Sequence, residues 1–387
     1  MSGSSENQMS WFSEGGAEAV ARRIKAFFDR NNRFRWDGII GSGANGSVYK
    51  VTYNNQSRLT TMAVKICHID VDLEGNKSYD EEDEDEGEEV QQLLNEKLWL
   101  KRLRNCHHII QSFEVDDDPL ANTPADLPPH RMQSWIFTEY IENGPLMRLV
   151  ERHLKQYEGE LFPCRLLWRF FMCLIRFCLE MAYWDAQQAG RVNIETDALE
   201  SLRRFPLGFL GHKDLSRNNI AVGDLLPEVQ HPEHDITPIL KLLDFGTADV
   251  MDPGNPRSLD GFGRNGYQRN ISDIGEVMEY LVLQEEEQIS ERKRVTIRGQ
   301  SFETFAGSLH TARTNLIARG IDAELINLIC YCRAVDQRRQ LNLIELALNV
   351  NNHVRNRGHN SIERETDKAI KLRITSITSD ADSISIS

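Results

Sequence analysis

The spacing of apolar residues changes along the N-terminal part of the chain. Residues 18–30 (EAVARRIKAFFDR) place their apolar side chains at helical spacing. Three β-rich runs follow at 34–40, 47–53 and 61–69, and turn residues separate them. This pattern predicts one helix and then an antiparallel β-meander.

Further along the chain the pattern turns mainly helical, with a few short strands. The expected elements are a helix at 89–103, strand-like segments at 108–115 and 134–141, helices from residue 145 onward, and hairpin-like strands near 219–223 and 239–243. The fold class is therefore α+β, with a small β-rich region before a larger, mainly helical one.

The most apolar stretch, residues 166–183, is interrupted by Arg169 and Arg176. It therefore predicts a buried helix rather than a membrane span, and no membrane partner is expected. The seven cysteines form an odd set without metal-ligand spacing, which favours buried free thiols in a reducing compartment. Residues 1–16 show no basic and apolar signal pattern, so we expect an intracellular location, cytoplasmic or nuclear.

Acidic residues outnumber basic ones, 59 to 45, and the formal net charge is −14. This balance argues against a general nucleic-acid binder, which shows a basic patch. Residues 80–89 alone hold nine carboxylates. A block of like charges is typical of a solvated, disordered loop, and the alternative is a docking surface for a basic partner.

The run GSGANGSVYKV at residues 41–51 suggests a phosphate-binding loop, although short glycine patterns are common. Here the run leads from one predicted strand to the next. A Rossmann or P-loop glycine run leads from a strand into a helix, and a Walker loop ends in Gly-Lys-Ser/Thr. Both of those readings are excluded.

Four further signals follow the glycine run in order. They are Ala63-Val64-Lys65, Glu96, His212-Lys213-Asp214-Leu215 with Asn219, and Leu243-Asp244-Phe245-Gly246. The ordered set resembles the eukaryotic protein kinase family, from about Phe34 to about Val350. Glu88 and Glu89 are alternatives to Glu96, but only Glu96 is followed by the leucine and the passage into a strand that the family shows.

The resemblance implies a bilobal kinase-like fold and ATP- and Mg²⁺-dependent transfer of a γ-phosphoryl group to a protein hydroxyl, most often of Ser or Thr. By the same resemblance, Lys65 contacts the α- and β-phosphates and Glu96 holds its ammonium. Asp214 orients the proton of the attacking hydroxyl. Asn219 and Asp244 supply oxygen ligands to Mg²⁺. His212 is expected to pack against the phenylalanine that follows Asp244.

The resemblance also assigns residues to the nucleotide itself. Those implied for the phosphate loop are Gly41, Ser42, Gly43, Ala44, Asn45 and Gly46. Those implied for the adenine are Val48, Ala63 and Ala221 on its faces, Thr138 at the gatekeeper position, and the backbone groups of Glu139 and Ile141 on its edge.

The implied domain organisation has four parts. They are an N-terminal extension with a helix (1–33), an N-lobe (34–140) with an acidic disordered insert at about 72–89, a C-lobe (141–350) with an insert at about 184–208, and a polar, Ser-rich, disordered tail (351–387).

Several positions depart from the family. Lys213 replaces an arginine that receives an activation-loop phosphate in the family, which implies weak control of that kind. No Ala-Pro-Glu follows Gly246, and the arginine that pairs with its glutamate is expected at Arg339. These departures leave two alternatives to a protein kinase: a nucleotide-binding scaffold without activity, or a kinase-fold enzyme acting on a small molecule.

Overall fold

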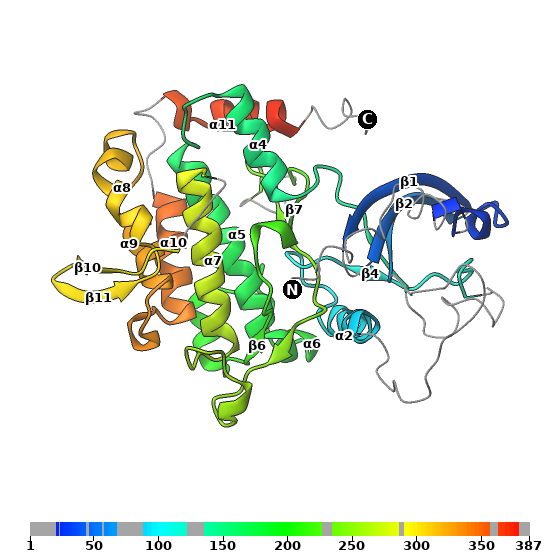
Figure 1. Ribbon diagram of the computed structural model, residues 1–387, viewed down its shortest axis with the longest axis horizontal. Coiled ribbons are helices and arrows are strands. Elements are labelled where there is room, and N and C mark those ends of the chain that lie inside the picture. The colour runs from blue at the N-terminus through cyan, green and yellow to red at the C-terminus, as the bar shows by residue number, and fades with distance from the viewer. Residues whose placement is uncertain are drawn as a thin grey trace, which may run out of the picture. The chain divides into compact units, whose positions relative to one another are not determined.

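A computed structural model gives the fold of the chain. It describes residues 21–22, 24–43, 46–55, 58–67, 88–121, 135–226, 234–285, 290–356 and 363–378. Contacts divide the chain into two compact units, the first made of residues 1–98 and 111–140 and the second of residues 99–110 and 141–387. The first unit carries an antiparallel sheet and the second is mainly helical, so the chain is mixed α+β (Figure 1).

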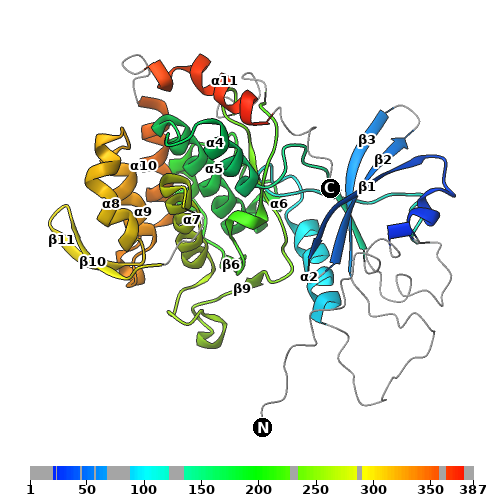
Figure 2. The ribbon, with the colours of Figure 1, turned by 45° about the horizontal axis from the view of Figure 1, so that its top comes forward.

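The sheet of the first unit has five strands in the order β1-β2-β3-β5-β4. They are β1 (Phe34–Gly43), β2 (Gly46–Asn55), β3 (Arg58–Ile66), β4 (Ser112–Phe113) and β5 (Trp135–Glu139). The predicted meander is confirmed, because β1 pairs with β2 and β2 with β3, both antiparallel (Figure 2).

An aromatic cluster closes one face of this sheet. Residues 21–22 and 24–28 are helical, and Phe28 at the end of this helix is fully buried. Its ring lies 5.4 Å from that of Phe34 on β1 and 6.4 Å from that of Phe137 on β5. The expected N-terminal helix is therefore present in the described residues, and its apolar side packs on the sheet.

Helix α2 (Glu88–Arg102) begins inside the acidic run. The prediction of a disordered insert at about 72–89 is therefore wrong at its C-terminal end, because Glu88 and Glu89 lie in the first helical turn. Carboxylates in the first turn and Lys101 and Arg102 in the last turn both suit the helix dipole. Residues 72–87 of the predicted insert lie outside the described residues.

The second unit contains most of the helices. Its elements are α4 (Leu146–Gln156), α5 (Cys164–Ala182), α6 (Trp184–Gln188), η1 (Leu199–Arg204), β6 (Leu210–Gly211), η2 (Arg217–Asn219), β7 (Ile220–Val222), β8 (Leu240–Leu242), β9 (Asp249–Val250), η3 (Pro256–Ser258), α7 (Gly266–Leu283), β10 (Lys293–Ile297), β11 (Gln300–Thr304), α8 (Gly307–Ala318), α9 (Ala323–Cys332), η4 (Gln337–Arg339), α10 (Leu343–Asn356), η5 (Glu363–Glu365) and α11 (Asp367–Thr378).

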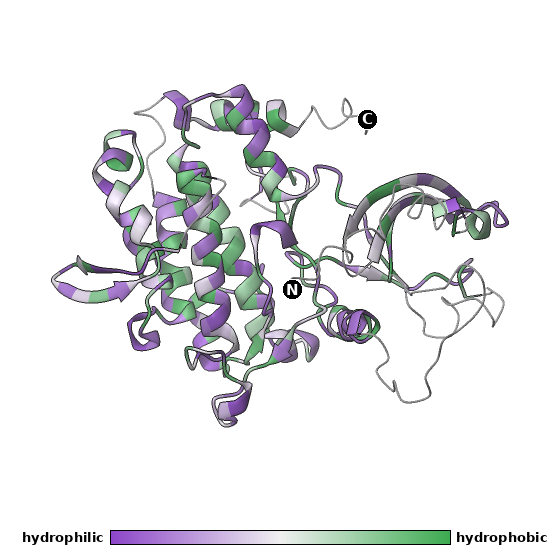
Figure 3. Ribbon diagram, viewed as in Figure 1, coloured by the Kyte–Doolittle hydropathy of each residue, from purple (hydrophilic) through white to green (hydrophobic). Residues whose placement is uncertain are grey.

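Helix α5 is the core of this unit. All of its residues except Arg169 are buried, and it packs against α7 and α10, where the hydrophobic colour gathers in Figure 3. Arg169 pairs with Asp235 at 3.0 Å, and Arg176 donates to the carbonyl of Ile194. The predicted buried helix is therefore confirmed, with each arginine partnered as burial requires. Among the described residues, no helix has both the length and the apolarity of a membrane span.

The sequence did not predict the hairpin of β10 and β11, which leads into α8. Its two-residue turn, Arg298-Gly299, has positive φ at both positions, 52° and 77°. These angles fit the two-residue turns that match the twist of a hairpin.

The C-terminal tail is not a disordered segment throughout, which corrects the prediction for residues 351–387. Residues 351–356 extend α10, and 363–378 form η5 and α11. Ile370, Ile374 and Ile377 lie on one side of α11 and are buried. The polar composition of the tail concealed this helical spacing.

The tail also completes the N-terminus of α5. The N-cap residue Pro163 has no side-chain group that can accept a hydrogen bond, and the carboxylate of Glu365 accepts from the N–H groups of Cys164 (2.8 Å) and Arg165 (2.7 Å) instead. Unpaired N–H groups at a buried helix start need such an acceptor. Residues 379–387 lie outside the described residues.

Candidate active site

A buried ion pair joins β3 to α2 in the first unit. Lys65 Nζ lies 2.7 Å from Glu96 Oε2, and the two side chains are 19% and 5% exposed. Lys65 is held in the centre of the sheet, opposite Val48 of β2 and Ile136 of β5. The contact expected between Lys65 and Glu96 is present. At this burial, removing either partner leaves the other charge uncompensated.

The glycine run occupies the turn between β1 and β2, where Gly43 pairs with Gly46. Gly46 has φ +151°, and a Cβ there would lie 2.4 Å from the carbonyl oxygen of Ile66, so the sheet itself requires glycine. At Gly41 a Cβ would meet nothing within 4 Å. Packing against the described residues therefore does not explain why residue 41 is a glycine.

Other residues of the expected phosphate loop are only partly described. The hydroxyls of Ser42 and Ser47 lie 3.1 Å apart and link the two strands just before the turn. Ala44 and Asn45 lie outside the described residues.

The end of β5 carries the residues expected next to adenine in the first unit. Thr138 is buried and pairs with Ala63 of β3 and Ser112 of β4. Ala63 is buried as well, whereas Val48 is half-buried. The Glu139 carboxylate accepts from the N–H of Gln111 (2.9 Å), and the Glu139 N–H donates to the Gln111 carbonyl (2.9 Å). Two hydrogen bonds therefore fix the strand end.

In the second unit, His212 anchors the loop that carries Asp214. The imidazole is fully buried, and its Nε2 lies 2.9 Å from the carbonyl oxygen of Leu243. Nδ1 accepts from the N–H of Asp214 (3.3 Å), and the ring packs edge-on against Phe245 at 4.7 Å, as expected. Burial lowers the pKa of His212, which favours the neutral imidazole that can accept this bond.

Asn270 is a positioning residue that the sequence did not indicate. From α7 its amide oxygen accepts from the N–H of His212 (3.0 Å), and its Nδ2 donates to the carbonyl of Leu210 (2.9 Å). It is fully buried. Its importance depends on a contact 58 residues away along the chain, so no local pattern marks it.

Asn219 links the loop of Asp214 to the segment that carries Asp244. Asn219 Nδ2 donates to Asp214 Oδ2 (2.8 Å) and to the Asp214 carbonyl (2.9 Å). The N–H of Leu243 donates to the carbonyl of Asn219 at 2.8 Å, which brings the neighbouring Asp244 to the same region. Asp214 is exposed and Asp244 is half-buried. Ala221 and Ile141 belong to this unit, and Ala221 lies buried on β7.

Two residues of this region have left-handed backbone conformations. Lys213 has φ 68° and Asp244 has φ 58°. Such angles are uncommon outside glycine, and they persist where the surrounding structure holds them. Here the hydrogen bonds of His212 and Asn219 hold both loops. Carboxylate and amide oxygens held in this way suit a hard divalent cation such as Mg²⁺.

Two buried arginines that the sequence did not single out lie in this unit, Arg264 in the segment after Asp244 and Arg333 after α9. Arg264 is buried, donates to the Ser272 hydroxyl (2.9 Å) and lies 3.9 Å from Asp260. Arg333 donates to Ser290 Oγ at 2.6 Å and lies 3.8 Å from Glu279.

Arg339, expected as the arginine that would pair with the absent glutamate of Ala-Pro-Glu, lies exposed in η4. Asp273, in the middle of α7, lies 3.2 Å from Arg269, and burial raises its pKa to about 7.

The structure thus joins Lys65 with Glu96 in the first unit, and Asp214 with Asn219 and the segment of Asp244 in the second. No protein-family model matches the chain, and no curated protein matches it.

Proposed function

We propose that the chain is an ATP- and Mg²⁺-dependent protein kinase with a kinase-like bilobal fold, which transfers the γ-phosphoryl group to a Ser or Thr hydroxyl of a protein. The observation that carries the proposal is the buried Lys65–Glu96 pair, 2.7 Å long and fixed between β3 and α2. A structural ion pair costs desolvation that apolar residues of the same size avoid. The need for a positive charge that contacts phosphate oxygens explains why a lysine, and not an apolar residue, occupies position 65.

The residues of the first unit fit the binding of a nucleotide. Lys65 contributes a positive charge for the α- and β-phosphates, and Glu96 orients it. The open space at Gly41 lets backbone N–H groups approach phosphate oxygens. Ala63 and Thr138 are the residues that would lie against the base, and Glu139 fixes the end of their sheet.

The residues of the second unit fit the transfer step. Asp214 accepts and orients the proton of the attacking hydroxyl, and the His212 ring fixes its backbone. Asn219 and Asp244 hold Mg²⁺ through their oxygens. Bound Mg²⁺ neutralises charge on the phosphates. The exposure of Asp214 leaves its carboxylate open to a hydroxyl on another molecule.

The test is transfer of labelled phosphate from ATP to generic protein substrates and to the chain itself, with Mg²⁺ present. Asp214→Asn is expected to lower kcat by roughly 10²–10⁴-fold, since it removes the proton acceptor. Lys65→Met is expected to abolish measurable transfer. Matched controls are Asp185→Asn, an exposed carboxylate in α6, and Lys101→Met, an exposed ammonium in the last turn of α2. Both should leave the rate unchanged.

ATP binding measured beside transfer separates the alternatives. Wild-type chain that binds ATP without transferring phosphate overturns the proposal in favour of a nucleotide-binding scaffold. Transfer to a small hydroxyl compound but to no protein overturns the assigned substrate class.

A further inference from the structure

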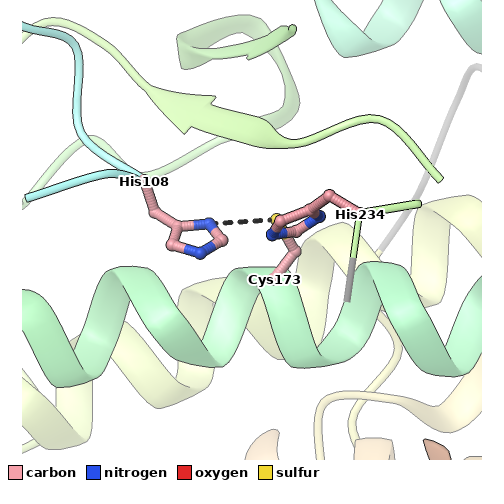
Figure 4. Close-up of side chains that lie close together, drawn as sticks. All are labelled: His108, Cys173 and His234. Atoms are coloured by element: carbon pink, nitrogen blue, oxygen red, sulfur yellow. Dashed lines mark hydrogen bonds between the residues drawn. The ribbon is translucent and has the colours of Figure 1, made fainter. Parts of the chain in front are cut away.

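Three side chains of types that can bind a metal meet inside the second unit, and none of them belongs to the proposed kinase site. His108 lies in the loop after α2, Cys173 in the middle of α5, and His234 in the segment before β8. All three are buried, at 0%, 2% and 2% exposed. In Figure 4 the dashed line joins His108 to the sulfur of Cys173, and the ring of His234 lies beside that sulfur.

The separations are close to those of a coordination shell. His108 Nδ1 lies 3.1 Å from Cys173 Sγ, and the ligand atoms of all three residues lie within 4.8 Å of one another. Tetrahedral Zn²⁺ with Zn–N and Zn–S bonds of about 2.0 and 2.3 Å places its ligand atoms about 3.3–3.5 Å apart. The shell therefore forms with side-chain rotations and no change of fold.

The second imidazole distinguishes this cluster from an ordinary hydrogen-bonded pair in the core. A thiol that donates to His108 and accepts from the N–H of Leu240 (3.1 Å) is already satisfied. That pair needs one imidazole only. The cluster holds two, with ring centroids 5.1 Å apart. A backbone N–H directed at the sulfur is also the outer-shell contact that stabilises a metal-bound thiolate.

The carboxylate of Glu195 lies next to the His108 ring, on the side opposite to the cluster. Glu195 Oε1 lies 3.3 Å from His108 Nε2. Its backbone is fixed in turn, because Asn193 Oδ1 accepts from the N–H of Glu195 at 2.9 Å. A histidine that binds a metal commonly donates its other N–H to a carboxylate, which sets the tautomer. A neutral His108 ring with its proton on Nε2, the nitrogen 3.3 Å from Glu195, directs the lone pair of Nδ1 at the cluster.

A cavity lies next to the carboxylate that contacts His108. It has a volume of about 170 Å³ and is lined by Glu195, Glu180, His107 and Gln187, among others. Glu195 therefore both contacts His108 and borders this cavity.

We propose that His108, Cys173 and His234 bind one Zn²⁺ ion, with Glu195 orienting His108. Binding requires the thiolate, so the Cys173 proton leaves to solvent when the S–Zn bond forms. A water molecule takes the fourth position, since three protein ligands leave one open. The ion ties the loop after α2, helix α5 and the segment before β8 together. It is separate from the Mg²⁺ of the proposed kinase reaction.

The test uses the full chain, stripped with a chelator and titrated with Zn²⁺ or Co²⁺. Zn²⁺ is expected to bind in a 1:1 ratio and to raise the melting temperature. Co²⁺ is expected to give a thiolate-to-metal charge-transfer absorption that Zn²⁺ then displaces. Cys173→Ala should abolish this absorption. His234→Asn should weaken binding, and Glu195→Gln should lower affinity by roughly 10–100-fold while the absorption persists.

Matched controls separate this site from other thiols and histidines. Cys178→Ala removes a fully buried thiol from the same helix, and His153→Phe removes a fully buried imidazole elsewhere in the unit. Both should bind Co²⁺ as the wild type does. No charge-transfer absorption in the wild type, or the same absorption in Cys173→Ala, overturns the proposal. If Cys173→Ala does not fold, unchanged affinity in both His234→Asn and Glu195→Gln overturns it equally. Kinase activity is not a readout here, so failure of either proposal leaves the other standing.

Discussion

Two fully buried histidines of the second unit have opposite surroundings. His108 faces the thiol of Cys173 at 3.1 Å and the carboxylate of Glu195 at 3.3 Å. His153 stacks on Phe162 with ring centroids 3.9 Å apart, and its Nε2 lies 3.2 Å from the carbonyl oxygen of Glu160. Burial is complete for both.

The neighbours of each ring determine which charge it favours. Burial lowers the pKa of His108, but Cys173 and Glu195 outweigh burial and hold it well above its usual value. Burial and the cation of Arg373 together lower the pKa of His153 to about 4. Burial alone therefore does not define the role of a histidine. The surroundings of His108 thus consist of a thiol and a carboxylate, whereas those of His153 favour a neutral packing residue.

The largest expected effect comes from loosening helix α11, which carries Arg373 beside His153. Ile374 is 1% exposed, and Ile374→Ala should lower the free energy of unfolding by about 2–5 kcal/mol through lost burial and an internal cavity. Urea denaturation measures it. Leu372→Ala in the same helix is the control, since Leu372 is 61% exposed and its loss should change stability by about 0.5 kcal/mol or less. Equal effects of the two variants contradict the packing of α11. Co²⁺ binding at His108 should be unaffected by either.

The next effect is on the pH dependence of stability. The pKa of His153 is about 4 in the folded state and lies below its value of 6.5 in the unfolded state. Between pH 6.5 and 4 the unfolded state therefore binds more protons, and stability falls as the pH falls through this window, by at most about 3 kcal/mol.

His153→Phe keeps an aromatic ring against Phe162 and removes the titration. We expect its stability to fall less than that of the wild type between pH 6.5 and 4.5, as measured by urea unfolding at both pH values. Parallel losses in the two proteins contradict a depressed pKa at His153.

The smallest effect is expected from Arg373→Met. The Arg373–Glu160 ion pair is 2.6 Å long but the Glu160 side chain is 50% exposed, so its loss should cost about 1 kcal/mol or less. Methionine keeps apolar contact with the ring of Tyr157, which the guanidinium covers at 4.0 Å. Removing the cation should raise the pKa of His153, visible as a higher midpoint of its imidazole NMR titration. An unchanged or lower midpoint contradicts the role of Arg373.

The sequence predicted correctly those helices and strands that show a clear periodic pattern of apolar residues. The meander of β1 to β3 follows from β-branched and aromatic runs, and α5 from its long apolar stretch. The prediction of a disordered tail was wrong because it rested on the polar average composition of the tail. Three isoleucines at helical spacing suffice to pack α11. The hairpin of β10 and β11 was missed because each strand has only five residues, so the alternation of apolar and polar positions is brief.

The residues of the candidate active site were predicted from the order of motifs along the chain, and one predicted contact is present in the structure. Lys65 and Glu96 were assigned from motif and helix position, and they lie 2.7 Å apart. The glycine run was read as one unit, but the structure separates its members: the sheet requires Gly46, and packing leaves Gly41 unexplained. The role of Asn270 was not predicted, because His212, its hydrogen-bond partner, is remote in sequence.

By itself, the sequence determined the α+β class, the order of the main elements and the residue types available for phosphoryl transfer. Periodicity and motif spacing are local properties, and a linear sequence displays them directly. Only the tertiary structure brought His108, Cys173 and His234 together, 65 residues separating the first from the second. It also decided that His108 faces a carboxylate while His153 faces an aromatic ring and a cation. Coordination and electrostatics act through space over a few ångströms, so they depend on the folded chain rather than on neighbours in sequence.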